Sequence, residues 1–283
     1  MNTIVYAEDW AVKLQERLSE PNKWKEICKV EYTDTKVLHN PYLTDATVQT
    51  GTRGTAYTHQ DVVQTDESVT IDTFKILPQL IDRADLAQST YSSQMELASS
   101  QGVLLNEAIE TGLFATYADL TTFDNSELGG GAGNITVASS NIDDIVRAIK
   151  RKIRKANGED LMNRNGVFIV WRPEDFELLE AYMQATGYMQ ADKALVNGAQ
   201  QGMMYMNVAH YSSNKLAAGH LIAGVKKVWH LGICRATYGQ VVIDSEPATA
   251  DGAVSAIAVV SRVDFKSKAW TKVKPVLYNV TVA

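Results

Sequence analysis

Cysteine is scarce in this sequence of 283 residues, which contains only Cys28 and Cys234. The two lie far apart and form no Cys-x-x-Cys pair, so the sequence predicts neither a disulfide framework nor a cysteine zinc site. We interpret both as packed thiols of a protein in a reducing compartment.

Long apolar runs and an excess of positive charge are also missing. Nowhere do about 18 consecutive apolar residues occur, as a membrane-spanning helix requires, and the opening MNTIVYAEDWAVKL lacks the pattern of a signal peptide. We therefore expect no membrane partner. The 33 carboxylates outnumber the 27 basic residues, which argues against a protein that coats nucleic acid by its overall charge. Apolar residues make up 45% of the chain, enough for a folded core.

The motifs of nucleotide-binding sites are missing as well. Residues 127–141, ELGGGAGNITVASSN, are rich in glycine, but a Walker loop needs a lysine after its last glycine, and none lies between Lys75 and Lys150. The dinucleotide pattern fails because Asn134 and its successors follow where the third glycine should be. We interpret the glycines as a flexible connection between two structural units.

No residue pattern indicates a reaction centre. His210, His220 and His230 recur at a spacing of ten, which fits neither a helical metal pair nor a zinc finger. A Gly-x-Ser-x-Gly elbow is absent. Three acidic pairs stand at predicted helix starts, where the helix dipole accounts for them without acid–base chemistry: Asp82/Asp85, Asp143/Asp144 and Glu174/Asp175. We therefore assign no catalytic, cofactor-binding or metal-ligating residue.

Two extended features begin the chain. Residues 1–35 mix apolar and charged residues, which indicates an amphipathic helical arm broken at Pro21. Residues 36–75 are rich in threonine and valine, and Thr50–Gly54 supplies a turn, so this stretch predicts a long β-hairpin. Its apolar residues are too few to bury a face, and an isolated two-stranded ribbon is marginal in water. We expect the hairpin to be supported from outside.

A long helix is predicted next. Apolar residues recur at the helical period from Leu86 to about Tyr117. At 1.5 Å per residue this helix is roughly 48 Å long, whereas a compact chain of this size has a radius of gyration of about 19 Å. Because the helix would span nearly the whole molecule, we expect a flat or elongated subunit.

An α/β unit follows the glycine-rich segment. A helix with an apolar stripe begins after Ser140 or Asn141, which we expect to cap it. GVFIVW at 166–171 predicts a buried strand, Pro173 starts another helix, and from about Val225 the sequence predicts strands again. The elements together predict an α+β fold.

The first helix of this unit carries the strongest local charge. Its outward side holds six basic residues: Arg147, Lys150, Arg151, Lys152, Arg154 and Lys155. We interpret this run as a solvated or subunit-contacting face, with a nucleic-acid contact as the alternative.

The order of these elements resembles the major capsid protein of tailed bacteriophages, which has the Hong Kong 97 fold. Residues 74–114, FKILPQLIDRADLAQSTYSSQMELASSQGVLLNEAIETGLF, are similar to the family's strand, junction and long spine helix. Residues 166–182, GVFIVWRPEDFELLEAY, are similar to a strand, Arg-Pro and helix of its axial domain. Both are architectural patterns rather than catalytic signatures.

The resemblance implies a division of the whole chain. It consists of an N-terminal arm at 1–35, an extended loop at 36–75, a peripheral domain with the spine helix at 76–135, an axial domain with α/β structure at 136–250, and C-terminal strands at 251–283 that return to the peripheral domain. The extended β-hairpin loop would lie across neighbouring subunits, which would supply its missing cover.

The implied function is structural, not enzymatic. Hexamers and pentamers would self-assemble in the host cytoplasm into an icosahedral shell, the capsid of a virion, around double-stranded DNA without sequence-specific contact. The implied partners are a portal and a separate scaffolding protein, because the sequence lacks the long N-terminal scaffolding segment of some members. A cement protein is a further candidate partner, and no cofactor is implied. The candidate subunit-contacting residues are Arg53, Tyr57, Arg147, Lys150, Arg151 and Arg154.

Two other functions are open. One is an encapsulin, a bacterial compartment shell of the same fold with an enzyme cargo. The other is a soluble enzyme with a dispersed site in the α/β unit. One departure from the family is chemical: no lysine lies between Lys36 and Lys75, so we do not expect the lysine-to-asparagine cross-links that form at the loop in some members.

Overall fold

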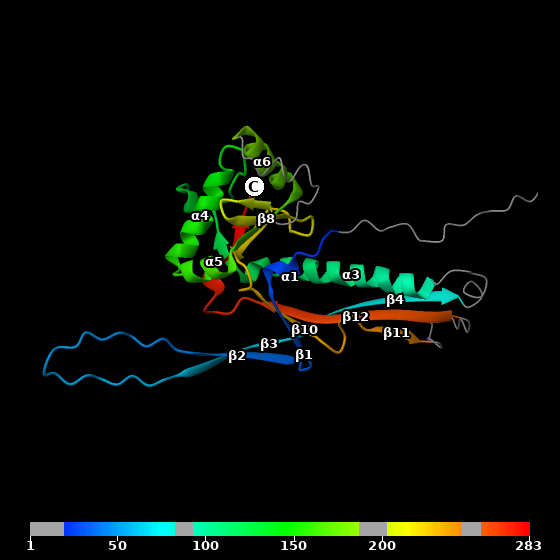
Figure 1. Cartoon of the computed structure of the whole chain (residues 1–283), viewed down its shortest axis with the longest axis horizontal. Coiled ribbons are helices and arrows are strands. Elements are labelled where there is room, and N and C mark those ends of the chain that lie inside the picture. The colour runs from blue at the N-terminus through cyan, green and yellow to red at the C-terminus, as the bar shows by residue number, and fades with distance from the viewer. Residues whose placement is uncertain (1–19, 83–92, 187–202, 245–255) are drawn as a thin grey trace, which may run out of the picture.

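The computed structural model describes residues 20–82, 93–186, 203–244 and 256–283. Figure 1 shows an elongated molecule, in which helix α3 (Ser93–Ala115) lies along a set of long strands and an α/β unit stands above one end of it. A hairpin projects beyond that same end. This shape agrees with the flat or elongated subunit that the long helix predicts.

A five-stranded sheet forms the long body. Its strands β1 (Lys29–Thr33), β10 (His230–Cys234), β12 (Ala256–Lys268) and β11 (Val241–Asp244) are joined in that order, and β4 (Thr73–Asp82) pairs antiparallel with β12 over ten residues. The strand β12 therefore holds the sheet together, because it alone pairs with three of the other four strands.

Helix α3 covers one face of this sheet. Leu105, Ile109 and Leu113 recur every four residues and are buried, since that spacing places them on one side of a helix. Gln101 fixes the helix to β12, because its side chain donates to the carbonyl of Val259 at 3.0 Å and accepts from the hydroxyl of Ser261 at 2.5 Å.

The prediction of one long helix is confirmed over residues 93–115. These 23 residues span about 34 Å at 1.5 Å each. The predicted start at Leu86 lies outside the described residues. The helix gives way to a short 3₁₀ turn, η1 (Thr116–Asp119).

A six-stranded sheet forms the core of the α/β unit. Its order is β5 (Thr121–Phe123), β13 (Leu277–Thr281), β9 (His220–Val225), β6 (Val167–Trp171), β8 (Val208–Ser212) and β7 (Met203–Tyr205). All five residues of β6 are buried, as the apolar run GVFIVW predicts. The parallel pairing of β6 with β8 is made possible by the helix α6 (Pro173–Ala185) that connects them in the chain.

Helix α4 (Ile142–Lys155) buries the predicted apolar stripe, including Ile145 and Ile149, and α5 (Glu159–Asn165) follows it. The predicted capping hydrogen bond is absent at this helix start. Asn141 is the N-cap residue, but its side chain turns away from the helix, accepting from the N–H of Ala138 at 2.9 Å and donating to the carbonyl of Thr136 at 2.8 Å. It thus fixes the preceding turn instead of the first helical N–H groups.

The predicted hairpin is confirmed at its root. Strands β2 (Val37–Leu43) and β3 (Gln64–Thr70) pair antiparallel along their full length. The predicted turn is also present: Gly54 adopts φ 88°, which suits glycine, and the N–H of Thr55 bonds to the carbonyl of Thr52 at 3.1 Å.

The helical arm predicted for residues 1–35 is wrong where the structure describes it. Residues 24–27 form only a single turn, α1 (Trp24–Ile27), and Lys29–Thr33 form a strand that pairs with β10. Trp24 and Ile27 are fully buried. The segment extends a sheet because it pairs with the edge of β10, a long-range partner that no local pattern reveals. Residues 1–19 lie outside the described part.

The glycine-rich segment is not a free link between two units. It follows η2 (Asn125–Leu128), and the N–H of Asn125 bonds to the carbonyl of Gly133 at 2.9 Å, which closes the loop on itself. The flanking β5 and Ile135 both attach to the C-terminal segment, through β13 and Val282. The segment therefore lies within the α/β unit, and the chain crosses from one sheet to the other earlier, between α3 and β5.

Sheet membership also differs from the division expected along the chain. The strands β10 and β11 fall inside residues 136–250, yet they pair in the five-stranded sheet. Of the closing strands, β12 joins β4, whereas β13 lies between β5 and β9 of the other sheet. Sheet membership is set by which strands pair in space, and here several of the pairs join strands that are far apart in the sequence.

Candidate subunit interface

The distal part of the hairpin, residues 44–63, has no core of its own. Its last backbone ladder bond joins the N–H of Thr44 to the carbonyl of Val63 at 2.9 Å. Beyond it, Val48 is 96% exposed and Tyr57 is 76% exposed. Val62 and Val63 are exposed as well, and several large apolar side chains left in water on one segment indicate a surface that another chain can cover.

Two glutamines hold the distal strands together in place of a backbone ladder. Gln60 accepts from the N–H of Thr47 at 2.8 Å and donates to its carbonyl at 3.0 Å, and Gln49 donates to the carbonyl of Thr58 at 3.0 Å. The two segments run alongside each other but too far apart for direct pairing, so many of their backbone groups are left for solvent or for a partner.

The root of the hairpin, in contrast, is anchored to the body. Leu38, Val69 and Ile71 form a small buried cluster with Trp270, which follows β12. Leu38 packs directly over Gly232 of β10, where an added Cβ would come within 2.5 Å of the leucine Cδ1. This cluster supports the root from within the same chain, and it ends before the distal part begins. The expected cover by neighbouring subunits stays a prediction.

The face of the five-stranded sheet opposite α3 is partly uncovered. Phe74, Ile76 and Leu80 alternate along β4, so they point to one face, and all three are exposed, Phe74 by 61%. Val242 of β11 is exposed as well. Because β4 pairs only with β12 among the described strands, its outer edge is also open for pairing.

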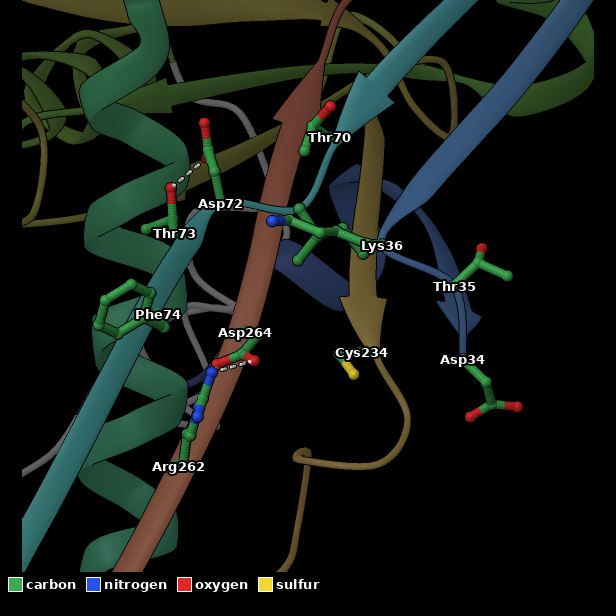
Figure 2. Close-up of a pocket in the computed structure, with 11 residues that line it drawn as sticks. Asp34, Thr35, Lys36, Thr70, Asp72, Thr73, Phe74, Cys234, Arg262 and Asp264 are labelled. Atoms are coloured by element: carbon green, nitrogen blue, oxygen red, sulfur yellow. Dashed lines mark hydrogen bonds and ion pairs between the residues drawn. The ribbon is translucent and has the colours of Figure 1, made fainter.

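A hollow of about 520 Å³ opens where the hairpin root meets this face (Figure 2). Most of its charged groups are already paired, and of its charged lining residues only Lys36 has no ion-pair partner in the described part of the chain. Arg262 donates two hydrogen bonds of 2.7 Å to Asp264 and lies over the Phe74 ring, and Lys266 contacts Asp72 at 2.9 Å and lowers the pKa of that carboxyl. The hollow therefore offers shape more than unbalanced charge, which suits a polypeptide segment better than a small ion.

The predicted contact residues fall on two separate elements. Arg53 and Tyr57 lie at the exposed end of the hairpin. The other four lie on α4, where Arg147, Arg151 and Arg154 are exposed and Lys150 is half-buried. The structure does not bring the two groups into contact, so they form two candidate surfaces.

The basic run on α4 is partly neutralised by its own chain. Arg147 pairs with Asp143, Arg154 lies 3.5 Å from Glu159, and Lys150 donates to the carbonyl of Met206 at 2.7 Å. Burial lowers the pKa of Lys150, and the neighbouring charge of Arg154 adds to this effect. Arg151 donates only to a backbone carbonyl, that of Glu127, so its charge is the least compensated among the three exposed arginines.

Sequence reasoning missed the apolar face of β4. The alternation of Phe74, Ile76, Pro78 and Leu80 in TFKILPQLID was present in the sequence, and it indicates one apolar side. What it does not show is whether that side faces the core. Here α3 covers the other face, which leaves the apolar side in solvent.

A buried charge network joins the N-terminal segment to α3 and to the loop after β8. Glu110 accepts from the N–H of Lys23 at 2.8 Å and lies near the Lys23 ammonium, which in turn contacts Glu20 at 2.9 Å. Burial raises the pKa of Glu110 despite these bonds. For Glu20, burial is outweighed by hydrogen bonds from Lys23, Asn214 and Ser213, which lower its pKa. The network fixes the position of the two sheets relative to each other.

The histidines with a spacing of ten lie apart and have separate partners. His210 is buried and accepts from the indole N–H of Trp171 at 2.8 Å, His220 contacts Asn279, and His230 contacts Glu31. Within the described residues no cluster of three or more histidine, cysteine or acidic side chains could hold a metal ion. None of the described helices has the length and apolar character needed to cross a membrane.

Known proteins similar to this chain are found by comparing structures and not by comparing sequences. No protein-family model and no curated protein matches the sequence. A chain of Mycobacterium phage Che8 matches over 97% of this chain and 96% of its own length, with a TM-score of 0.66 and 16% identity. A chain from the mature capsid of bacteriophage PhiM1 matches over 99% and 92%, with a TM-score of 0.63 and 12% identity.

Other matches have the same character. A chain from the capsid of Ralstonia phage GP4 matches over 98% of this chain and 95% of its own length, with a TM-score of 0.65 and 9% identity. Since the likeness extends over nearly the whole chain, it concerns the whole architecture. The chain therefore has the fold of phage capsid proteins, as the resemblance of its sequence to tailed-phage major capsid proteins predicts.

Proposed function

We propose that this protein is the major capsid protein of a tailed phage and self-assembles into an icosahedral shell of hexamers and pentamers around double-stranded DNA. The observation that carries the proposal is the exposed distal hairpin, residues 44–63. A protein that works as a monomer gains nothing from a long, uncovered arm with apolar side chains, whereas a shell subunit can bury it against a neighbour.

The open face of the five-stranded sheet supplies a surface of the right kind for that arm. The exposed side chains of Phe74, Ile76 and Leu80 are apolar, as are Val48 and Tyr57 of the distal hairpin. Burying both sets against each other would remove apolar area from water, at about 25 cal/mol per Å². We infer that the hairpin of one subunit covers this face on the next.

The remaining features of the proposal follow the family pattern. The division into arm, extended loop, peripheral domain, axial domain and C-terminal strands is part of it, although the sheets cross these boundaries. The proposal also includes assembly in the host cytoplasm and three partners: a separate scaffolding protein, a portal and a cement protein. The acidic net charge of −6 is compatible with a lining that does not bind the packaged DNA tightly.

Assembly is tested by sedimentation and electron microscopy of the purified chain, with and without a scaffolding partner. We expect capsomer rings or closed shells. A variant in which residues 46–58 are replaced by Asn-Gly should keep its circular dichroism spectrum and lose assembly, because the root cluster at Leu38 and Trp270 is intact. A wild-type chain that stays monomeric under all conditions would refute the proposal.

The shell should be held by noncovalent contacts alone. A cross-link to asparagine needs an unprotonated lysine amine, and Arg53 at the hairpin turn cannot replace it because a guanidinium stays protonated. Shells boiled in detergent and reductant should give one band at 31.1 kDa. A ladder of multimers would show that another lysine forms the bond.

A further inference from the structure

Helices α4 and α6 present faces of opposite charge. The sequence of α4 contains six basic and two acidic residues, whereas α6 contains four acidic residues and no lysine or arginine. Figure 1 shows α4 along one side of the α/β unit and α6 at its upper end. One chain therefore carries a basic surface on α4 and an acidic surface on α6, and these two surfaces could bind each other between copies.

The charged residues on each helix form a regular outward row. On α4, Arg147, Arg151 and Arg154 are exposed and recur at spacings of four and three residues, which places them on one face. On α6, Glu174 and Glu177 are exposed at a spacing of three. The rise of 1.5 Å per residue separates each pair of neighbours on these rows by about 5 Å along the axis, so the spacings of the two rows match.

Like charges crowd on each helix by itself. Burial raises the pKa of Asp175, the nearby Arg172 opposes this rise, and the adjacent Glu174 adds to it. Burial likewise raises the pKa of Glu180, with an added contribution from Glu177. Contact with an opposite charge would relieve this repulsion on either helix.

One residue in each row has the least compensation from charges of the same chain. The Arg151 guanidinium is bound only by the carbonyl of Glu127, while Arg147 and Arg154 have carboxylate partners. On α6, Glu174 pairs with Arg172 at 3.3 Å, and Glu177 forms no ion pair within the parts of the chain that the structure describes. Arg151 and Glu177 are therefore the natural pair.

We propose that the Arg151 face of α4 docks on the Glu177 face of α6 in a second copy of this chain. The contact rests on the proposed shell function and specifies one of its subunit interfaces. Because the two surfaces are different, the contact is head-to-tail, and repetition of it closes a ring when the rotation between subunits allows. It is separate from the contact of the hairpin, so neighbouring subunits of a capsomer would be joined by two different contacts.

Charge reversal tests the pairing directly. Arg151→Glu and Glu177→Arg each place like charges opposite one another at every contact of the ring. Each variant should raise the protein concentration needed for half-assembly by at least about tenfold, and the double variant on one chain should restore it. The defect should be weaker at high salt, since exposed charges are screened.

Mixing the two single variants gives a second readout. A subunit with Arg151→Glu meets opposite charges on both sides only when both of its neighbours carry Glu177→Arg, and the reverse also holds. The two variants can alternate around a six-membered ring with every contact matched, whereas a five-membered ring must contain one mismatch. The equimolar mixture should therefore form hexamers and fail to form pentamers, as native mass spectrometry or electron microscopy would show.

A matched control is available on α5. Arg164 is 64% exposed and pairs with an acidic residue four positions earlier, Asp160, as Arg147 does with Asp143 on α4, but it belongs to neither row. The substitution Arg164→Glu should leave assembly unchanged. Thermal melting of every variant checks that the fold is intact.

The outcomes separate the two proposals. A wild-type chain that never assembles refutes the shell and this contact with it. Wild-type shells together with normal assembly of Arg151→Glu and Glu177→Arg refute the contact alone. Defective single variants that the double variant does not restore also refute it, because each helix would then be meeting some other surface.

Discussion

All five side chains of β6 are buried in the six-stranded sheet, whereas Val48 and Tyr57 of the hairpin are 96% and 76% exposed. Both regions are made of residues that favour strands. The difference is in what covers them: α4 and α6 pack against the sheet, but nothing in the described chain covers the distal hairpin. The α/β unit thus buries its own core, while in the proposed shell the hairpin is covered only after assembly.

Removing a core side chain from β6 should change the free energy of unfolding more than any other substitution in these two regions. Phe168 in β6 is fully buried, so Phe168→Ala should lower the free energy of unfolding by about 4 kcal/mol through lost burial and the cavity left behind. Tyr57→Ala should change it by less than about 0.5 kcal/mol. Urea unfolding of the free subunit measures both, and similar losses would contradict the division.

Lowering the pH should have the second-largest effect on stability, because a buried histidine of the six-stranded sheet becomes protonated. His210 accepts a hydrogen bond from Trp171 and is buried, and burial lowers its pKa from 6.5 to about 4. Because the folded pKa lies below the unfolded one, this contribution to stability is complete above pH 6.5 and is lost as the pH falls toward 4. The loss amounts to about 3 kcal/mol.

The histidine effect is measured by unfolding the subunit in urea across this pH range. The His210→Gln variant should have a shallower dependence of stability on pH than the wild type. Phe168→Ala serves as the control, since it lowers stability without removing a titrating group. If stability depends on pH equally steeply in the wild type and in His210→Gln, His210 is not the group responsible.

The hairpin root should show an intermediate effect. Leu38 is buried in the cluster with Trp270, so Leu38→Ala should lower the free energy of unfolding by about 2 kcal/mol, near the lower end for such changes because the cluster is small. Amide exchange in β2 and β3 should rise more than in β6. Unchanged exchange in the hairpin would show that its support comes from elsewhere.

The smallest effect on the free subunit, and the clearest sign of assembly, concerns Arg53. The hairpin turn is exposed, so trypsin should cut there readily in the free subunit without unfolding the α/β unit. In assembled particles a neighbour should cover the site and slow cleavage by at least about tenfold. Equal rates in both states would mean that the distal hairpin is not a contact between subunits.

Several elements could be predicted because their patterns are local. The buried strand at 166–171, the helix that starts at Pro173 and the long helix each follow from a run or period within a few turns of chain. The hairpin followed from its composition and turn, and its lack of apolar residues predicts the cover by a neighbouring subunit that we propose. Arg53, Tyr57 and the basic run were visible as turn or charged positions.

Other features depended on distant residues. The segment around Trp24 was predicted as part of a helical arm, but it packs in the core and continues as a strand, because β10 offers an edge far along the chain. The acidic face on α6 was present in the sequence as Glu174 and Glu177, yet its proposed pairing with α4 is meaningful only once both rows are known to face outward.

The sequence by itself determined the α+β class, the long helix, the hairpin with its turn and the apolar and charged faces of the helices, since each depends on hydrophobic period and backbone preference over short distances. Tertiary structure alone decided which strands share a sheet, why the glycine-rich segment closes on itself and which apolar face stays in solvent. Those outcomes depend on long-range pairing and packing, where the free energy of one segment is set by whichever distant partner covers it.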